Sequence, residues 1–344
     1  MRAMVLHQFS SPLRMEDLPV PRAGHDEVVV KVRACAPDML DVKVRAGQYD
    51  VTPPRVLGHE ISGEVAEAGS SVKNVGEGDR VAVYDYLNCG ACEFCWRGRE
   101  TLCRNNRGIV GLAIDGGFAD YVKVPGRNVL PIPEDLSHEA ATTLVSPVST
   151  SLHALRERAK VKPGDRLLIV GAAGGVGIHM VQMAGLFGAS VIAADVSDEK
   201  NEKTKEYGAE AVINTTDRPF DRSFDEALMD LTGGRGVDAA IDLYGSSESL
   251  AACYRSLDTA GTLVHIGSKI GDKLEIDPTR LTMKEVVITG CRYNTKEEFY
   301  SSLELVRAGK IKPVLSFSFP LQELDEILDM IEQRKVFGRA VAIL

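Results

Sequence analysis

The sequence predicts an α/β chain in two parts, a mainly β domain followed by a doubly wound parallel sheet. The first observation is length, because 344 residues correspond to about two domains of ordinary size. The second is a change of pattern along the chain. Up to about residue 150, apolar residues fall in short segments that Gly and Pro interrupt, whereas from residue 166 onward apolar strands alternate with helical stretches.

The N-terminal segments are typical of strands in a β domain. They are short, rich in Val and bounded by turn residues, as in EVVVKVRA (27–34), SGEVAEAG (62–69) and DRVAVYDY (79–86). Short segments of this kind predict a mainly β domain.

The second half has the order of a parallel sheet. Most of its apolar strands are separated by enough residues for a helix, which is the pattern of repeated β-α-β units. The predicted strands are RLLIV (166–170), VIAAD (191–195), AVIN (211–214), VDAAIDL (237–243), TLVHIG (262–267) and EVVITG (285–290).

The final segment is predicted to return to the first domain. Thr295 and Glu298 have the spacing of a helix-starting capping box, and VFGRAVAIL (336–344) is typical of a strand. We therefore divide the chain into residues 1–148, 149–287 and 288–344.

Composition excludes some classes of function. The net charge is −9 and Lys and Arg form no basic run, so a nucleic-acid partner is not expected. The longest apolar run, 166–194, is broken by glycines and contains His179 and Gln182, which argues against a membrane span. The N-terminus lacks the apolar core of a secretory signal, so we expect a cytoplasmic, reducing location with thiols free or metal-bound.

The stretch GAAGGVG (171–177) predicts a dinucleotide site. It lies between a strand and a helix that starts near Val176, where small residues let backbone amides approach a pyrophosphate at the positive end of the helix. In the G-x-G-x-x-G template its three positions are Ala172, Gly174 and Gly177, so alanine replaces the first glycine. The alternative is a turn that uses glycine only for close packing. We expect an amphipathic helix, with one face formed by Val176, Met180, Met183 and Phe187.

Asp195 ends the next strand, 24 positions after Gly171. A carboxylate there accepts the two hydroxyls of an adenine ribose and repels a 2′-phosphate, which favours NAD(H) over NADP(H). The alternative role is a helix N-cap, which Ser197 or Asp198 would equally fill. His179 is interpreted as a packed or hydrogen-bonded residue.

Four cysteines with the spacing C-x2-C-x2-C-x7-C lie within residues 88–104. Together they supply the four thiolates of a closed tetrahedral zinc shell, which holds a loop and leaves no position for substrate. Four unrelated buried thiols, or a redox pair of Cys92 and Cys95, are the alternatives. The predicted structural-zinc ligands are Cys89, Cys92, Cys95 and Cys103.

These features together resemble the medium-chain dehydrogenase/reductase superfamily, which comprises the zinc-containing alcohol dehydrogenases and their quinone and enoyl reductase relatives. The resemblance rests on VLGHEISGEV (56–65), GDRVAV (78–83), the cysteine segment and residues 171–196. It implies a GroES-like, mainly β catalytic domain, a Rossmann domain, an active-site cleft between them and a homodimer or homotetramer. Predicted cofactor contacts are Gly174, Gly175, Val176, Gly177, Asp195, Lys200, Thr150 and Ile266.

The resemblance also implies a catalytic zinc site, and here the chain departs from the pattern. Asp38 stands where the alcohol dehydrogenases have a cysteine ligand, His59 and Glu60 keep the GHE motif, and Ser146 falls at the third ligand position. Leu40 replaces the Ser or Thr that starts the proton relay. These changes favour the zinc-free relatives.

A second zinc ion nevertheless stays open as an alternative. Asp38, His59 and Glu60 are all competent ligands, and some sugar dehydrogenases of the superfamily have Asp at the first position. Alternatively, the GHE segment is only a structural corner of the β domain. Asp41 is predicted to orient His59, and Cys35 is interpreted as a small buried apolar residue.

The leading hypothesis is an NAD(H)-dependent oxidoreductase that acts on a ketone or aldehyde, the corresponding alcohol, or an activated double bond such as an enone, without catalytic zinc. Asp38, Asp41, His59 and Glu60 are its predicted catalytic residues, and one of the carboxyl groups beside the imidazole is expected to supply a proton. The first alternative is a zinc-dependent alcohol or polyol dehydrogenase. The second is a non-catalytic dinucleotide-binding protein.

Overall fold

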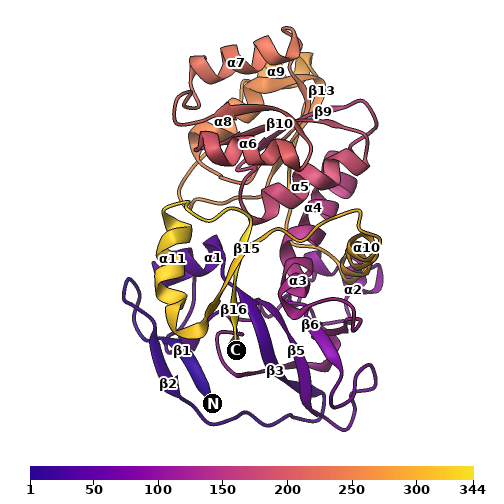
Figure 1. The fold of residues 1–344 in the computed structure, drawn as a ribbon. Coiled ribbons are helices and arrows are strands. Elements are labelled where there is room, and N and C mark those ends of the chain that lie inside the picture. The colour runs from indigo at the N-terminus through magenta and orange to yellow at the C-terminus, as the bar shows by residue number, and fades with distance from the viewer. The chain divides into compact units, whose positions relative to one another are not determined.

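The computed structural model describes residues 1–344, whose contacts divide into two compact units. Unit 1 comprises residues 1–146, 295–307 and 313–344, and unit 2 comprises 147–294 and 308–312. Both chain ends lie in unit 1, at strands β1 and β16 (Figure 1). None of the helices combines the length and the apolar character that crossing a bilayer requires.

Unit 2 contains a six-stranded sheet in the order β11-β10-β9-β12-β13-β14, and each neighbouring pair is parallel. This confirms the predicted doubly wound sheet. The direction of winding reverses between β9 and β12, and ligands of such sheets bind at the carboxyl ends of the strands near this point. The strands are β9 (Arg166–Val170), β10 (Ser190–Asp195), β11 (Ala209–Asn214), β12 (Val237–Asp242), β13 (Leu257–His265) and β14 (Val287–Gly290).

Helices cover both faces of this sheet, because its strands are apolar on both sides. Leu168 and Val170 pack in one core with Phe224 and Leu228 of α7, while Leu167, which is also fully buried, points to the opposite face. The helices of the unit are α4 (Ser149–His153), η4 (Ala154–Ala159), α5 (Gly175–Leu186), α6 (Asp198–Glu206), α7 (Arg222–Thr232), α8 (Ser247–Ser256) and α9 (Pro278–Met283).

Helix α5 corrects one expectation. It begins at Gly175, as the turn predicts, but it is buried on most of its circumference rather than on one face. Ile178, His179 and Val181 are buried in addition to Met180 and Met183. A helix enclosed by its neighbours does not need a polar face, so the predicted amphipathic pattern was wrong.

Unit 1 is built on a seven-stranded sheet in the order β15-β16-β3-β5-β6-β8, with β7 also paired to β3. A three-stranded sheet, β2-β1-β4, completes it. The strands are β1 (Arg2–Leu6), β2 (Arg14–Asp17), β3 (Glu27–Ala36), β4 (Arg55–Val56), β5 (Glu60–Ala68), β6 (Arg80–Val83), β7 (Tyr121–Pro125), β8 (Val129–Pro131), β15 (Leu315–Pro320) and β16 (Arg339–Ile343).

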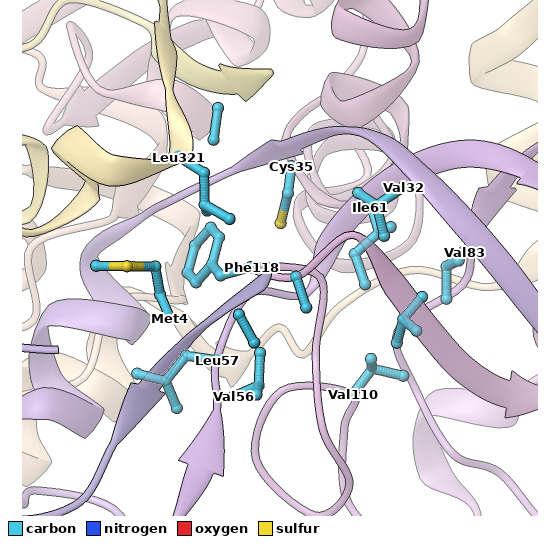
Figure 2. Close-up of a cluster of buried hydrophobic side chains, with 14 of the residues drawn as sticks. Met4, Val32, Cys35, Val56, Leu57, Ile61, Val83, Val110, Phe118 and Leu321 are labelled. Carbon is cyan, nitrogen blue, oxygen red and sulfur yellow. The ribbon is translucent and has the colours of Figure 1, made fainter. Parts of the chain in front are cut away.

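The core of unit 1 gathers side chains from both sheets and from the C-terminal return. Figure 2 shows Met4 of β1, Ile61 of β5 and Leu321 of the return around the ring of Phe118. Cys35 lies in the same cluster and is fully buried, as its interpretation as a small apolar residue requires.

Short helices connect these strands, and longer ones form the return. They are α1 (Met39–Arg45), α2 (Glu93–Trp96), η1 (Glu100–Leu102), η2 (Gly126–Asn128), α3 (His138–Thr143), η3 (Leu144–Val148, which runs across the boundary into unit 2), α10 (Lys296–Arg307), η5 (Leu321–Glu323) and α11 (Leu324–Glu332).

The return to unit 1 begins later than the predicted residue 288. Strand β14 pairs in parallel with β13, with Ile288 opposite Leu263, so it belongs to the Rossmann sheet. The chain re-enters unit 1 at Thr295, where the predicted capping box is present: Thr295 N donates to Glu298 at 2.7 Å and Glu298 N to Thr295 Oγ1 at 3.3 Å. Strand β16 then pairs antiparallel with β3.

Candidate functional site

The glycine turn of unit 2 has the close backbone contacts of a dinucleotide site. Gly174 is the N-cap of α5, so the first amides of that helix are available to an anion. A Cβ on Gly177 would lie 2.2 Å from the carbonyl oxygen of Gly171, which explains why this position is glycine. Ala172, at the template's first position, is fully buried. The turn therefore fits a bound pyrophosphate.

Asp195 lies at the carboxyl end of β10, directly beside this turn. One carboxylate oxygen accepts from Ala173 N at 2.9 Å and the other from Val196 N at 2.8 Å. Each oxygen keeps a lone pair for a further donor. Helix α6 is capped by Ser197, which accepts from Lys200 N, so Asp195 is not its N-cap.

The other predicted cofactor residues also lie in unit 2. Lys200 is in the first turn of α6, and Ile266 follows β13, where its N–H donates to Asp242 O at 3.0 Å. Thr150 lies in α4 and its buried hydroxyl has no hydrogen-bond partner. His179 is fully buried, with Nδ1 2.6 Å from Gly175 O, in agreement with its interpretation as a hydrogen-bonded packing residue.

The four cysteines of unit 1 converge at one point. Sulfur–sulfur distances are 3.6 Å for Cys92–Cys95, 3.9 Å for Cys89–Cys95 and 3.9 Å for Cys92–Cys103. Thiolates bound at about 2.3 Å around a tetrahedral ion lie about 3.8 Å from one another. The donor set and its spacing therefore fit a structural zinc site, which Cys89, Cys92, Cys95 and Cys103 would hold.

Backbone amides near these cysteines favour the ionised thiolate form. Cys92 precedes the one-turn helix α2, and amides of Cys95 and Arg104 lower its pKa to about 6. Cys89 N donates to Cys103 Sγ at 3.3 Å. Cys89, Cys92 and Cys95 are only partly buried, unlike thiols that serve as core residues. These contacts favour metal ligation over four unrelated buried thiols.

A second cluster in unit 1 brings Asp38, His59 and Glu60 together. Asp38 is the N-cap of α1, with Oδ1 accepting from Leu40 N at 2.7 Å, while His59 and Glu60 stand at the start of β5. One potential ligand atom from each residue lies within 4.8 Å of the others. His59 Nε2 is 3.9 Å from Asp38 Oδ2.

Arg339 of β16, which the sequence analysis did not identify, completes this cluster. Its guanidinium donates to both oxygens of Glu60, at 2.9 and 2.7 Å, and approaches Asp38 Oδ2 at 3.5 Å. Arg339 is only 7% exposed. An arginine inside an apolar strand, as in FGRAVAI, was the available signal, because such a charge is rarely buried without a partner.

Asp85 is a second residue that the sequence analysis missed. It follows β6 in the apolar stretch VAVYDYL, it is fully buried, and neither carboxylate oxygen has a hydrogen-bond partner. Burial raises the pKa of Asp85 to about 7; the backbone amides of Asp85 and Tyr86 oppose the shift, and repulsion by Asp38 adds to it. An acid in this environment holds a proton near neutral pH.

The other residues of the cluster differ in the direction in which their pKa values are shifted. Burial raises the pKa of Glu60 to about 8, although Arg339 opposes the shift. Burial alone would raise the pKa of Asp38, but His59, Arg339 and two backbone amides lower it. Burial lowers the pKa of His59, and Arg339 adds to this effect while Asp38 opposes it. His59 is therefore neutral and Asp38 ionised at pH 7.

Asp41 is differently placed from the prediction. Its oxygens accept from Asp38 N at 3.0 Å and from Gly58 N at 3.2 Å, which ties α1 to the GHE segment. His59 Nδ1 is buried without a hydrogen-bond partner, so Asp41 does not orient the imidazole directly. Its role in this structure is that of a capping-box residue.

Arg339 and the cap of α1 compete with a metal ion for the oxygens of this cluster. Three potential ligands are close enough, but both oxygens of Glu60 accept from Arg339, and Asp38 Oδ1 caps α1. A zinc ion bound here would have to share these carboxylates with the guanidinium and the helix cap. Ser146 is buried in the π-helical turn η3.

Comparison with known proteins finds relatives of both parts of the chain. The family "Alcohol dehydrogenase GroES-like domain" matches residues 24–134, and "Zinc-binding dehydrogenase" matches 175–308. The NAD-dependent alcohol dehydrogenase of Sulfolobus acidocaldarius is 34% identical over 349 positions, which cover 99% of each chain. An acryloyl-coenzyme A reductase of Sulfurisphaera tokodaii is 30% identical, again over 99% of each chain.

Solved structures show the same fold. The alcohol dehydrogenase of Aeropyrum pernix superposes with a TM-score of 0.92 at 30% identity, over 100% of both chains. Sequence and structural similarity thus extend from one end of the chain to the other, across both units and the tetra-cysteine lobe. The chain belongs to the medium-chain, zinc-binding alcohol dehydrogenase family, and it is an NAD-dependent alcohol dehydrogenase-like oxidoreductase.

Proposed function

We propose that the protein transfers hydride between NAD(H) and a ketone or aldehyde, the corresponding alcohol, or an activated carbon–carbon double bond, without a catalytic zinc ion. The observation that carries the zinc-free part is the bidentate contact between Arg339 and Glu60. It places a guanidinium against Glu60, one of the three candidate zinc ligands. The similarity to an acryloyl-coenzyme A reductase supports the double-bond substrates.

In this proposal the residues of unit 1 supply the proton and the charge. Bound NADH supplies the hydride, and the protein must stabilise negative charge on the substrate and protonate it. Glu60 and Asp85 have a pKa of about 8 and about 7, so each holds a proton at neutral pH that it can donate. Arg339 compensates the charge on ionised Asp38 and holds Glu60 by two hydrogen bonds.

The preference for NADH is supported by Asp195. Its carboxylate is already oriented by two amides beside the glycine turn, so it receives ribose hydroxyls at little entropic cost. A 2′-phosphate at the same place would meet a negative charge. We propose that Gly174, Gly175, Val176, Gly177, Lys200, Thr150 and Ile266 contribute the remaining contacts.

Calorimetry and a substrate panel test this function. NADH is expected to bind, and NADPH is expected to bind at least tenfold more weakly. The substitution Asp195→Ala is expected to weaken NADH binding by about tenfold or more, because a charge-assisted hydrogen bond is lost. NADH oxidation is then measured with carbonyl, enone, quinone and enoyl-thioester substrates. Turnover of any of these supports an enzyme. Binding of NADH with no turnover on the whole panel would favour a non-catalytic dinucleotide-binding protein.

A zinc-dependent alcohol or polyol dehydrogenase remains the alternative, and one observation favours it. The carboxyl groups of Asp38, Asp41, Glu60 and Asp85 are gathered in the interior, with Arg339 as the buried cation among them. A divalent ion would stabilise the ionised forms of these carboxyl groups, which burial otherwise disfavours. Incubation with phenanthroline separates the proposals: zinc-free catalysis survives until the chain unfolds, whereas zinc-dependent catalysis is lost first and returns with added Zn²⁺.

We also propose a homodimer or homotetramer. Strand β14 is the outer strand of the Rossmann sheet, and Val287 on it is 50% exposed, with Met283 just before it 75% exposed. An apolar sheet edge of this kind is a template for pairing with a second copy. Light scattering measures the oligomeric state, and Val287→Lys is expected to shift the protein toward the monomer.

A further inference from the structure

Lys296 occupies an unfavourable position in unit 1. It is the first residue of α10, at the end of the helix where the dipole disfavours a positive charge. Its ammonium is also partly withdrawn from water: Nζ donates to the carbonyl of Arg127 at 2.6 Å and lies 5.6 Å from the ring centre of Tyr84. Glu298, in the same turn, is engaged by Thr295. Something else must stabilise this cation.

The groups that favour the charged lysine belong to the cysteine lobe. Burial lowers the pKa of Lys296, and the charges that oppose this shift are Glu100 and Cys95, while Arg127 adds to it. Both groups belong to the segment 88–104 that forms the lobe, and Cys95 is one of the four predicted zinc ligands.

Direct contacts connect Cys95 to α10. Asn88 Nδ2 approaches Cys95 Sγ at 3.6 Å, and Arg127 Nε donates to Asn88 O at 3.1 Å. Lys296 then donates to Arg127 O, across 169 residues of sequence. Asn88, in the middle of this path, is only 2% exposed, whereas Cys95, Arg127 and Lys296 are partly buried.

Metal loading changes the charge at one end of this path. Four thiolates around Zn²⁺ carry a net charge of −2, which is more negative than the metal-free lobe with most of its thiols protonated. A dianion partly shielded from water attracts nearby cations strongly, and the groups around a metal site adjust its affinity. Arg127, whose Nε donates to Asn88 O, and Lys296, which donates to Arg127 O, are cations near this charge, and the attraction is stronger while the metal is bound.

We propose that Lys296 and Arg127 are the counter-cations of the zinc–tetrathiolate lobe, and that zinc in the lobe therefore anchors the first turn of α10. This inference rests on the structural zinc of the proposed function. Because coupling between two binding events is reciprocal in free energy, Lys296 must strengthen zinc binding by as much as zinc stabilises the position of Lys296.

Zinc release into a chromogenic chelator tests the first half of the coupling. Lys296→Met keeps the length of the side chain and removes the charge, and it is expected to release zinc about tenfold faster than wild type, the low end of effects seen for residues that support metal ligands. Lys296→Arg is expected to stay within about threefold. Lys310→Met, which removes an exposed lysine beyond the end of α10, is the matched control and is expected to match wild type.

Hydrogen exchange tests the second half. Zinc removal from wild type is expected to increase exchange in the peptide that covers α10, and Lys296→Met is expected to show the higher exchange even with zinc bound. Emission of Trp96, the only tryptophan, follows metal loading at the lobe itself. Should Lys296→Met not accumulate in folded form, Arg127→Met carries the same predictions.

The outcomes separate the inference from the zinc site. The inference alone is overturned if the wild-type chain holds one zinc ion, Lys296→Met releases zinc at the wild-type rate, and hydrogen exchange in α10 does not change when zinc is removed. A wild-type chain that holds no zinc, and takes up none on titration, overturns the structural zinc and the inference together.

Discussion

Unit 1 contains two clusters of potential metal ligands, and they differ in how the charge of their ligand atoms is stabilised. In the cysteine lobe, the sulfur atoms are partly exposed, spaced as a tetrahedral ion requires, and supported by backbone amides. In the Asp38–His59–Glu60 cluster, the ligands are buried and the protein's own Arg339 neutralises them. The first arrangement suits a bound metal ion, whereas in the second a side chain of the protein already contacts two of the potential ligands.

The difference comes from the donor atoms. Neutral thiols stay close together without a metal and gain a strong bond when zinc replaces their protons. Buried carboxylates repel each other at all times, so the fold must provide a cation or a proton. Sequence motifs alone do not distinguish these cases, because both clusters contain competent zinc ligands.

The largest expected effect follows from removing one thiol. Cys92→Ser is expected to lose the lobe's zinc and to lower the melting temperature by on the order of 10 °C, because metal binding contributes directly to folding. His59→Gln is expected to change it by less than about 3 °C, as a residue that holds no metal. Calorimetry measures both, with Cys291→Ala as the control outside the lobe. If Cys92→Ser and His59→Gln lowered the melting temperature equally, the predicted difference between the two clusters would be wrong.

Removing the internal cation is the next largest change. Arg339→Met leaves Glu60 buried without its partner, and the free energy of unfolding is expected to fall by about 3–5 kcal/mol. The loss is expected to be greater at pH 9 than at pH 6, because the pKa of Glu60 is about 8 and a protonated acid needs the guanidinium less. Urea unfolding at the two pH values provides the measurement. A loss that ignores pH would show that Arg339 acts by packing alone.

Asp85 gives a pH-dependent effect of opposite sign. Its pKa in the folded chain is about 7, against 3.8 in an unfolded one, so the folded state binds more protons between these values. Its ionisation therefore costs nothing below about pH 4, and the cost grows to about 4 kcal/mol by pH 7 and then stays constant.

Asp85→Asn removes this cost, so its stability relative to wild type is expected to rise steadily between about pH 4 and 7. Urea unfolding of wild type and Asp85→Asn across this range measures the difference. A difference that is flat with pH would mean that Asp85 has a partner and an ordinary pKa.

The smallest expected effect concerns the lost relay. Leu40→Ser restores a hydroxyl next to Asp38, but without a zinc-bound alcohol there is no proton for it to relay. The value of kcat is expected to change by less than about twofold, since general acid–base groups contribute only where a proton is in transit. A tenfold rise in alcohol oxidation would instead support the zinc-dependent alternative. Steady-state kinetics in both directions decides this.

Local patterns predicted much of this molecule because their causes are local. The glycine turn lies within seven residues and the cysteine lobe within 15, so spacing alone conveyed the geometry. The alternation of strands and helices likewise predicted the parallel sheet. Each of these features depends on neighbours in sequence.

The compensation of the second cluster was not predictable in this way. Arg339 meets Glu60 across 279 residues, because β16 pairs with β3, which in turn pairs with β5. The isolation of Asp85 is a property of packing that no motif records. The burial of α5 on most sides was missed for the same reason, since enclosure by neighbouring elements is a tertiary effect.

The most direct test is the zinc content of the purified wild type, Cys92→Ser and His59→Gln, measured by mass spectrometry per chain. The account predicts one equivalent in the wild type, none in Cys92→Ser and one in His59→Gln, because only the cysteine lobe holds metal. Two equivalents in the wild type, reduced to one by His59→Gln, would contradict it.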